Sequence, residues 1–217
     1  MISAPVERFP ALDALGTVLH GFVLRVPGLD VRTDRDAALQ SLEPFHDAVR
    51  RSFGVRDLRL AEQVHGNLVG VVTAESPAKS ARADALVTCD PNVLLGIHVA
   101  DCCAVFLVDP KRNAVGLAHS GKKGTGLNVV GAAIRKMSAE FGTDPADVVA
   151  QLSPCIRPPE YEVDFASEIV CELEHAGLHR IFDCGENTAR DLERFYSYRM
   201  EKGRTGRMLA LLALKSS

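Results

Sequence analysis

The sequence predicts a mixed α/β (α+β) fold, a single-domain sandwich built on a mixed sheet with flanking helices. Short apolar segments separated by turn residues cluster in the middle of the chain, which is typical of strands. Segments with apolar residues at three- and four-residue spacing lie before and after this region and indicate helices. The central segments show little alternation, which favours strands buried on both faces. Strand groups that alternate with helices predict a layered α/β architecture.

Length and composition predict one soluble domain. The chain has 217 residues, enough for a single sizeable core, and we expect residues 1–217 to form one domain. A net charge of -3 argues against a mainly electrostatic nucleic-acid binder. No apolar run approaches the roughly 20 residues that cross a bilayer, and the N-terminus lacks a signal-peptide pattern. We therefore expect a cytoplasmic protein without nucleic-acid or membrane partners, and a monomer is compatible with the sequence.

The first third of the chain predicts strands around one long helix. The expected elements are a strand at Val18–Leu24, a helix capped by Thr33 or Asp34 and running to about Phe53, strands at Leu58–Val64 and Leu68–Val72, and a loop at Ser76–Arg82. The helix has apolar residues such as Leu42 and Val49 on one side. The small and polar composition of the last segment is typical of a loop.

The remaining segments predict a strand-dense centre followed by helices. The expected strands are Ala85–Thr88, Val93–Val99, Ala104–Val108, Ala114–Ala118, Val148–Leu152 and a closing strand at Met208–Leu214. The expected helices are Thr125–Phe141, Phe165–Ala176 and a short one at Asn187–Arg194. Gly142 and Gly177 are natural helix ends. Residues 109–113 form a plausible tight connection between two of the strands.

Three side chains that bind soft metals stand at the ends of these apolar runs. They are His65, Cys102 and His119. Two imidazoles and a thiolate suit zinc, and three protein ligands leave one coordination position open for chemistry. Their spacing forms no local metal motif, so on the residues alone a core role for each of them stays open. Their position at strand ends, where loops carry function on a rigid scaffold, favours the metal site.

The segment after His119 predicts an anion site. A strand leads into His119-Ser120-Gly121-Lys122-Lys123-Gly124 and then into a helix, a layout that presents backbone N–H groups and a helix dipole to an anion. Lys122 and Lys123 would add charge, and Gly124 would allow a close backbone approach. The segment is not a Walker motif. The alternative is an ordinary helix-capping loop with two solvated lysines.

Three neighbouring residues are predicted to be structural. His20 and His98 lie inside strands and are expected to be core histidines with satisfied hydrogen bonds. Cys103 should point to the face opposite Cys102 because side chains alternate along a strand, so we expect it in the core. For Asp101, which precedes Cys102, two roles stay open: it could orient a ligand or move a proton, or it could make a structural hydrogen bond.

The ordered motifs of the chain resemble those of a known family. They are His20-Gly21-Phe22 with Arg25, Gln63-Val64-His65-Gly66, Ala83-Asp84-Ala85-Leu86-Val87-Thr88, Ala100-Asp101-Cys102, His119, Ser153-Pro154-Cys155-Ile156, Tyr161-Glu162-Val163, and Phe195-Tyr196-Ser197-Tyr198-Arg199 with Thr205-Gly206-Arg207-Met208. With them the chain resembles the bacterial laccase-domain proteins, also called polyphenol oxidoreductases or peptidoglycan editing factors. Characterised members are similar to zinc-dependent purine nucleoside phosphorylases with adenosine deaminase side activity.

The resemblance implies a function and a set of site residues. It implies zinc, with copper less likely, held by His65, Cys102 and His119, and a purine nucleoside and phosphate as small-molecule substrates. We expect Arg25, Lys122, Lys123 and Gly124 to bind the substrate or its anion, and Asp101 is the candidate catalytic residue.

The sequence departs from the family pattern in one loop, and this keeps two alternatives open. Where the family has His-Ala-Gly-Trp-Arg-Gly, this chain has His119-Ser120-Gly121-Lys122-Lys123-Gly124, and it contains no Trp. A Lys in place of Arg keeps the charge but loses the bidentate fork. One alternative is a cysteine-type hydrolase acting on peptidoglycan precursors, with Cys102 as nucleophile and His119 as base. The other is a zinc-binding paralogue that has lost catalysis.

Overall fold

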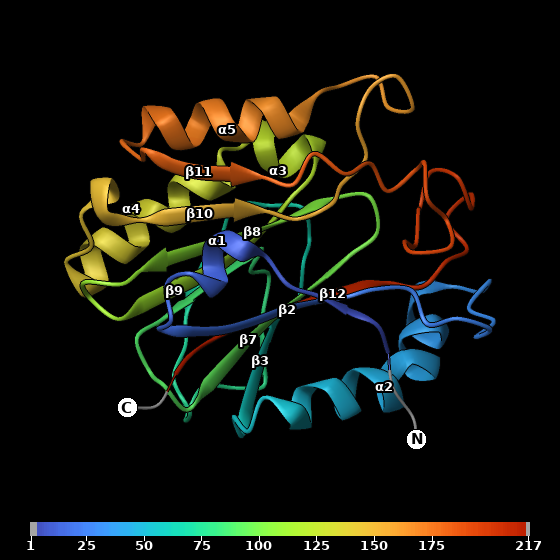
Figure 1. The fold of residues 1–217 in the computed structure, drawn as a ribbon, viewed down its shortest axis with the longest axis horizontal. Coiled ribbons are helices and arrows are strands. Elements are labelled where there is room, and N and C mark those ends of the chain that lie inside the picture. Colours follow the sequence, from blue (N-terminus) through green and yellow to red (C-terminus); the bar gives the residue numbers. More distant parts are fainter. Residues whose placement is uncertain (1–3, 216–217) are drawn as a thin grey trace.

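Two six-stranded sheets pack face to face in the computed structural model, which describes residues 4–215 (Figure 1). The strands of the first sheet are, in spatial order, β1 (Val6–Glu7), β2 (Val18–Val23), β12 (Met208–Leu214), β7 (Val93–Val99), β3 (Asp57–Ala61) and β5 (Lys79–Ser80). Those of the second sheet are β11 (Arg180–Asp183), β10 (Val149–Leu152), β8 (Cys103–Asp109), β9 (Ala114–Ser120), β6 (Ala85–Thr88) and β4 (Val69–Val71). Both sheets mix parallel and antiparallel pairs.

Helices cover the two outer faces of this sandwich. Helix α2 (Arg35–Ser52) packs on the first sheet through an apolar cluster that includes Val49. Helices α4 (Val129–Phe141) and α5 (Phe165–His175) cover the second sheet. Figure 1 shows the resulting layers of helix, sheet, sheet and helix. The remaining helical elements are α1 (Pro10–Asp13), α3 (Lys122–Gly126) and a 3-10 turn at Pro145–Asp147.

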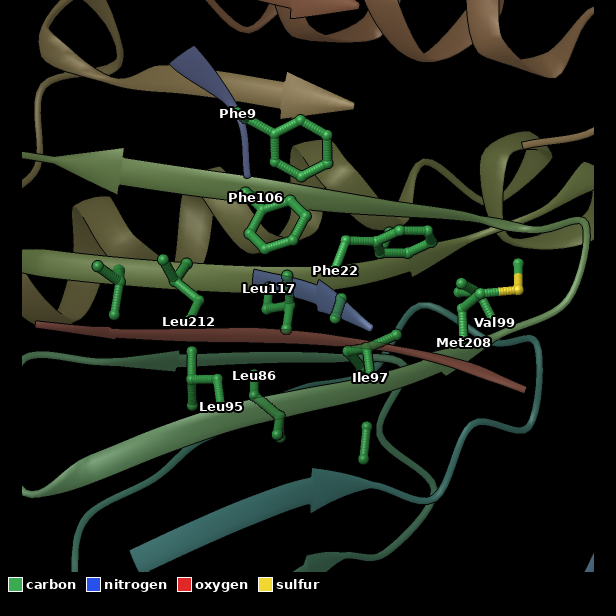
Figure 2. Packing of buried hydrophobic residues seen from close by; sticks show 14 of the residues in the cluster. Phe9, Phe22, Leu86, Leu95, Ile97, Val99, Phe106, Leu117, Met208 and Leu212 are labelled. Atoms are coloured by element: carbon green, nitrogen blue, oxygen red, sulfur yellow. The ribbon is translucent and has the colours of Figure 1, made fainter. Parts of the chain in front are cut away.

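The largest apolar cluster fills the space between the two sheets. Phe22 and Ile97 of the first sheet meet Phe106 and Leu117 of the second, and all four side chains are fully buried (Figure 2). The central strands β7, β8 and β9 are buried on both faces along most of their length, because helices cover the sides that face away from this cluster. Close packing of this kind makes the sheet ends a rigid support for the loops that follow them.

The structure confirms the predicted fold class and most elements. The strands at Ala85–Thr88, Val93–Val99 and Met208–Leu214 have the expected bounds. Asp34 caps α2 by accepting hydrogen bonds from two backbone N–H groups. Gly142 ends α4 in the left-handed conformation. Within residues 4–215, no helix is both long and apolar enough to cross a membrane.

Three predictions of local structure were wrong. Residues 76–82 are not all loop, because Lys79–Ser80 pair with β3 as strand β5. The single helix expected at 125–141 is two helices, because Asn128 adopts a left-handed conformation and caps α4 through the Gly131 N–H group. No helix forms at 187–194; this segment consists of turns, and Asn187 bridges to Cys155. Sequence patterns of only a few residues carry too little signal to predict strands β1, β5 and β11.

Candidate functional site

The three predicted metal ligands meet at one end of the sandwich. His65 follows β3, Cys102 lies in the turn between β7 and β8, and His119 is the penultimate residue of β9. One ligand atom of each lies within 4.8 Å of those of the other two. The imidazole rings of His65 and His119 meet edge to face with centroids 4.8 Å apart. His119 is buried, Cys102 is half-buried and His65 is exposed, so the cluster opens toward solvent on one side.

Asp84 organises two of the three ligands. Its carboxylate is fully buried, and Oδ1 lies 2.9 Å from Nδ1 of His119. The same carboxylate accepts hydrogen bonds from the backbone N–H groups of Val64, His65 and Gly66 at 2.7 to 3.1 Å. Burial raises the pKa of Asp84, but these hydrogen bonds and the charge of His119 outweigh burial and hold the pKa below its usual value. Because Nδ1 of His119 is engaged, Nε2 is the nitrogen free to bind a metal.

The chain turns sharply to bring His65 to this position. Strand β3 ends at Ala61, earlier than the predicted Val64, because Gln63 and His65 have left-handed φ angles of 65° and 58°. Such angles are unfavourable for residues with a Cβ. The three hydrogen bonds to Asp84 offset this cost, so the loop depends on a residue that precedes β6.

The turn that carries Cys102 is anchored by Asp101. Asp101 has a φ of 80°, and both of its carboxylate oxygens are engaged. Oδ1 accepts from the Thr188 hydroxyl at 2.7 Å, and Oδ2 accepts from the Arg199 backbone N–H at 2.7 Å. The structural alternative stated for Asp101 therefore has direct support from its contacts, which tie the Cys102 turn to the C-terminal segment.

Gly121 leaves the space that the Cys102 thiol occupies. A Cβ at position 121 would lie 2.4 Å from Sγ of Cys102, a distance that real atoms do not adopt. Any side chain at this position would therefore displace the thiol. Cys103, the adjacent cysteine, is fully buried in the cluster beneath α4 and α5, as predicted.

The electrostatics of the cluster favour a thiolate. Burial raises the pKa of Cys102, but the charge of His119 and hydrogen bonds with His119 and His65 outweigh it and bring the pKa to about 6. Burial lowers the pKa of His119, yet the Cys102 charge and Asp84 raise it to about 9. A thiolate and two imidazoles are the donor set that zinc prefers, and zinc bonds of about 2.0–2.3 Å place tetrahedral ligands about 3.3–3.8 Å apart. The ligand atoms of His65, Cys102 and His119 all lie within 4.8 Å of one another, which is near that spacing.

The cluster lies in the wall of a cavity of about 1040 Å³. Its aromatic lining consists of Tyr161, Phe165 and Tyr198. Its cationic lining consists of Arg35, Lys122, Lys123, Arg199, Lys202 and Arg207. A volume of this size lies at the upper end of the range for small-molecule sites.

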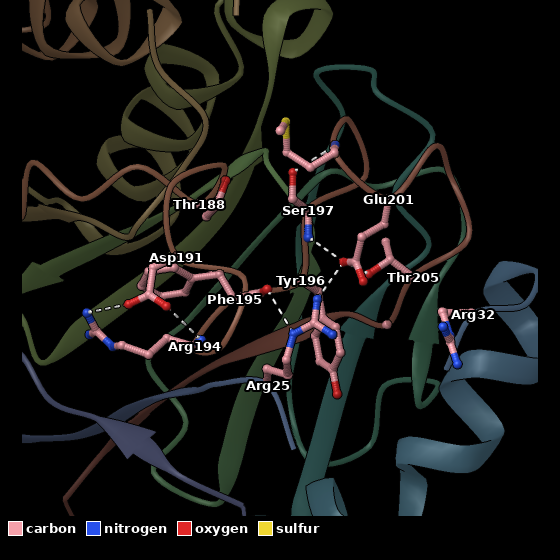
Figure 3. Close-up of polar contacts among 12 residues, drawn as sticks. Arg25, Arg32, Thr188, Asp191, Arg194, Phe195, Tyr196, Ser197, Glu201 and Thr205 are labelled. Carbon is pink, nitrogen blue, oxygen red and sulfur yellow. Dashed lines mark hydrogen bonds and ion pairs between the residues drawn. The ribbon is translucent and has the colours of Figure 1, made fainter. Parts of the chain in front are cut away.

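The residues predicted to bind an anion do not all reach this cavity. Lys122 and Lys123 line it, whereas Gly124 is buried in α3 beneath them. Arg25 lies elsewhere. Its guanidinium forms an ion pair of 2.6 Å with Glu201, donates to the Phe195 carbonyl and stacks on the Tyr196 ring (Figure 3). These contacts occupy Arg25 in joining the N- and C-terminal segments, and Arg25 is not among the residues that line the cavity, so its role in substrate binding stays a prediction.

The two histidines that were predicted to lie in the core differ in burial. His20 is fully buried and its Nε2 accepts a hydrogen bond from the Phe9 N–H group at 2.8 Å, as predicted. His98 differs from the prediction, because it is only partly buried and lines the cavity. A histidine on a central strand gives no sequence signal that distinguishes these positions.

Several functional residues were missed by reasoning from sequence. Asp84 was recognised only as part of a motif, although a charged residue directly before a fully apolar strand was a signal that it needs buried partners. Arg207 was likewise named only as part of a motif, and Arg35 was not singled out at all. They lie at opposite ends of the chain, and only the fold brings them to one cavity.

Comparisons with known proteins agree with this architecture. A family model described as multi-copper polyphenol oxidoreductase laccase matches residues 28–170 and 163–215. A purine nucleoside phosphorylase of Deinococcus radiodurans is 34% identical over 247 residues, covering 97% of this chain and 93% of that protein. The purine nucleoside phosphorylase YlmD of Bacillus subtilis is 28% identical over 196 residues, covering 72% of this chain and 70% of the relative.

Solved structures share the fold. YlmD from Geobacillus stearothermophilus superposes with a TM-score of 0.80 at 23% identity, covering 96% of this chain and 94% of that one. The hypothetical protein YfiH of Bacillus licheniformis superposes with a TM-score of 0.79 at 24% identity, covering 91% and 93% of the two chains.

Proposed function

The chain belongs to the multi-copper polyphenol oxidoreductase laccase family, and from this premise we propose that it is a zinc-dependent purine nucleoside phosphorylase. The observation that carries the proposal is the placement of His65, Cys102 and His119 in the wall of a cavity with aromatic and cationic sides. Relatives named purine nucleoside phosphorylase support the substrate class.

The metal would be held by these three residues. Zinc held by three protein ligands supplies a Lewis acid with an open coordination position. Asp84 holds His119 in the orientation and tautomer that direct Nε2 toward Cys102, as carboxylates commonly do behind metal-binding histidines. In the described residues 4–215 this is the one cluster of three or more such ligands, whereas multicopper oxidation requires several centres. The donor set therefore favours zinc over copper.

The cavity walls suit a nucleoside and an anion. Tyr161 and Tyr198 offer aromatic faces on which a purine can stack. Lys122 and Lys123 lie at the start of α3 and would attract phosphate into the cavity. Phosphorolysis forms a bond between a phosphate oxygen and the anomeric carbon of the ribose and breaks the bond to the purine nitrogen. The products are the free base and ribose 1-phosphate.

A deaminase side activity requires a different attacking group. Water would add to the purine ring of adenosine and ammonia would leave, giving inosine. Both reactions would use the same cavity, so we include adenosine deamination as a second activity of this site. The requirement for phosphate separates the two, because only phosphorolysis consumes it.

A cysteine-type hydrolase is the second candidate, and one observation favours it. Asp84, His119 and Cys102 form a chain of contacts that resembles the carboxylate, base and nucleophile of a catalytic triad. A thiolate that binds zinc is not free to attack a substrate. Metal content therefore decides between the two candidates.

The test combines product analysis with metal analysis. Purified protein is incubated with adenosine or inosine, with and without phosphate, and free base, inosine and ammonia are quantified. We expect phosphate-dependent release of base and about one zinc per chain. Cys102→Ala should lose zinc and turnover, whereas the matched Cys103→Ala should keep zinc because Cys103 lies in the core.

Each of the other possible results of these assays supports a different function or a different metal. Full zinc occupancy without turnover would mean that the chain binds metal but has lost catalysis. A zinc-free protein whose Cys102 is rapidly alkylated would favour the hydrolase. Copper in place of zinc would overturn the choice of metal.

A further inference from the structure

Two arginines from opposite ends of the chain line the same cavity. Arg35 is the first residue of α2, and Arg207 directly precedes β12. His98 of β7 lines the cavity with them, and the positive charges of both arginines contribute to the lowered pKa of its ring, after burial and the neighbouring His46. Arg35 likewise lowers the pKa of Arg207, second to burial. Both guanidinium groups therefore contribute positive charge to this one cavity.

Neither arginine has a carboxylate partner. Among residues 4–215, Arg35 and Arg207 form no ion pair, and their polar contacts are to backbone carbonyls. Arg207 donates through Nη1 to the carbonyls of Thr205 and Gly206. Other cations of the cavity are partly neutralised, since Lys122 and Arg199 share Glu162. Two guanidinium groups that line one cavity without carboxylate partners give it a positive potential that attracts an anion.

The polar side chains that line the cavity near Arg35 and Arg207 are engaged with other groups. Gln63 uses its amide to bind the backbone of His98, donating to the carbonyl at 2.6 Å and accepting from the N–H at 3.0 Å. Asp101, the carboxylate in the cavity lining, is already engaged by Thr188 and by the backbone of Arg199. No carboxylate of the cavity lining therefore forms an ion pair with either arginine.

We propose that Arg35 and Arg207 bind a phosphate group, either inorganic phosphate or the 5′-phosphate of a nucleotide. The planar forks of two guanidinium groups match the oxygens of a phosphate, which gives strong charge-assisted hydrogen bonds. The assignment rests on the proposed function for its substrate class. It places the anion at the α2 and β12 side of the cavity, rather than at the short helix α3 with Lys122 and Lys123.

The position of Arg207 connects this site to the metal ligands. Arg207 lines the cavity together with Cys102 and with His65 and His119, the two candidate histidine ligands. A phosphate on the arginine pair would therefore share the cavity with a purine nucleoside next to the metal.

The test measures binding directly, without turnover. Inorganic phosphate, adenosine and adenosine 5′-monophosphate are titrated in separate arms into the zinc-loaded protein by calorimetry. The variants are Arg35→Gln and Arg207→Gln, with Arg51→Gln on the same helix and Arg204→Gln near β12 as matched controls that lie outside the cavity lining. We expect phosphate or nucleotide affinity to fall about 10-fold or more in the cavity variants and to be unchanged in the controls.

The arms separate the two sources of phosphate. Binding of inorganic phosphate that depends on both arginines assigns the site to a co-substrate. Tighter binding of the monophosphate than of adenosine, lost in the same variants, assigns it to a nucleotide. Arg207→Lys should bind with intermediate affinity, because it keeps the charge and loses the fork. Arg35 is exposed, so its variant is expected to fold even if an Arg207 variant does not.

Two outcomes would overturn the assignment. One is unchanged affinity for both ligands in folded Arg35→Gln and Arg207→Gln proteins. The other is a loss of affinity in Lys123→Gln but not in the arginine variants, which would return the anion to helix α3. A protein that binds phosphate through the arginines but releases no purine base would leave this site intact and refute only the proposed reaction.

Discussion

Asp84 and His119 are joined twice, by a 2.9 Å contact between the carboxylate and Nδ1 and by a 2.7 Å hydrogen bond from the His119 N–H group to the Asp84 carbonyl. The second bond belongs to the junction at which β9 pairs with the start of β6. The orientation of His119, a candidate metal ligand, is therefore built into the pairing of two strands. The same carboxylate holds the loop that carries His65.

Replacing Asp84 should weaken metal binding more than it weakens the fold. In Asp84→Asn the side chain loses its charge, and its NH2 group faces N–H donors or the His119 ring. We expect the zinc dissociation constant to rise about 10- to 100-fold, which is typical when the hydrogen-bond partner of a metal-binding His is lost. Competition with a chromogenic zinc chelator measures the constant, and thermal unfolding of the metal-free protein measures the fold.

A second buried aspartate supplies the control for this experiment. Asp109 is also fully buried, and its Oδ1 accepts two backbone N–H groups in the turn between β8 and β9. Asp109→Asn should lose stability and keep its affinity for zinc. Equal zinc affinity in the Asp84 variant and in the unaltered protein would refute the role given to Asp84.

Gly121 should be required for the position of the Cys102 thiol. The Cβ of Gly121→Ala would lie 2.4 Å from Sγ, so the thiol must move out of its place beside His119. We expect the purified variant to contain much less than one zinc per chain, measured by elemental analysis. Gly126→Ala is the control, since a Cβ there meets no atom within 4 Å. Retention of zinc by both variants would show that the loop can adjust.

Residue identity was sufficient to predict which three side chains gather into a group that could hold a metal, but not the groups that support them. His65, Cys102 and His119 belong to residue types that bind zinc, so their presence at strand ends pointed to the site. Asp84 acts across 35 residues of sequence on His119, and nothing local to either residue reveals that contact. The ion pair of Arg25 could not be predicted for the same reason, because its partner Glu201 lies 176 residues away.

The prediction of local structure failed where the backbone conformation of a single residue ended a helix. The helix expected over residues 125–141 has apolar residues at helical spacing, such as Val130 and Ile134, yet a left-handed Asn128 divides it. Asparagine adopts that conformation more readily than most residues, but it is also common inside helices. In contrast, the apolar runs that form β7 and β12 clearly indicated buried strands. Both strands have the expected bounds.

Arg25 should contribute to stability and not to anion binding. Its ion pair with Glu201 joins two side chains that are 18% and 16% exposed. Arg25→Gln leaves Glu201 partly buried without its partner, and we expect a loss of about 2 kcal/mol in the free energy of unfolding. Affinity for phosphate should not change. Denaturant unfolding and phosphate titration measure the two quantities.

An exposed ion pair provides the comparison for Arg25. Arg8 and Asp13 form a pair whose side chains are 48% and 44% exposed. Arg8→Gln should cost less than about 1 kcal/mol, because water screens exposed pairs. A loss of phosphate binding in Arg25→Gln with normal stability would restore Arg25 as a substrate-binding residue.

His20 should make the fold sensitive to acid. Burial, and then the charge of Arg8, lower the pKa of the folded-state imidazole to about 4, whereas an unfolded histidine titrates near 6.5. Between these values the unfolded chain binds the proton and the folded chain does not. The stabilising contribution is therefore complete above about pH 6.5 and is lost as the pH falls toward 4. The loss reaches up to about 3 kcal/mol, from about 1.4 kcal/mol for each pKa unit.

The physical reason is that Nε2 of His20 accepts a hydrogen bond from the Phe9 N–H group and cannot do so when protonated. His20→Gln keeps an acceptor but does not titrate. Urea unfolding from about pH 7.5 to about pH 4.5 should therefore show a shallower loss of stability in the variant than in the unaltered protein. Some loss should remain, because burial also lowers the pKa of His46 to about 4. Identical pH profiles for the two proteins would show that His20 does not govern acid unfolding.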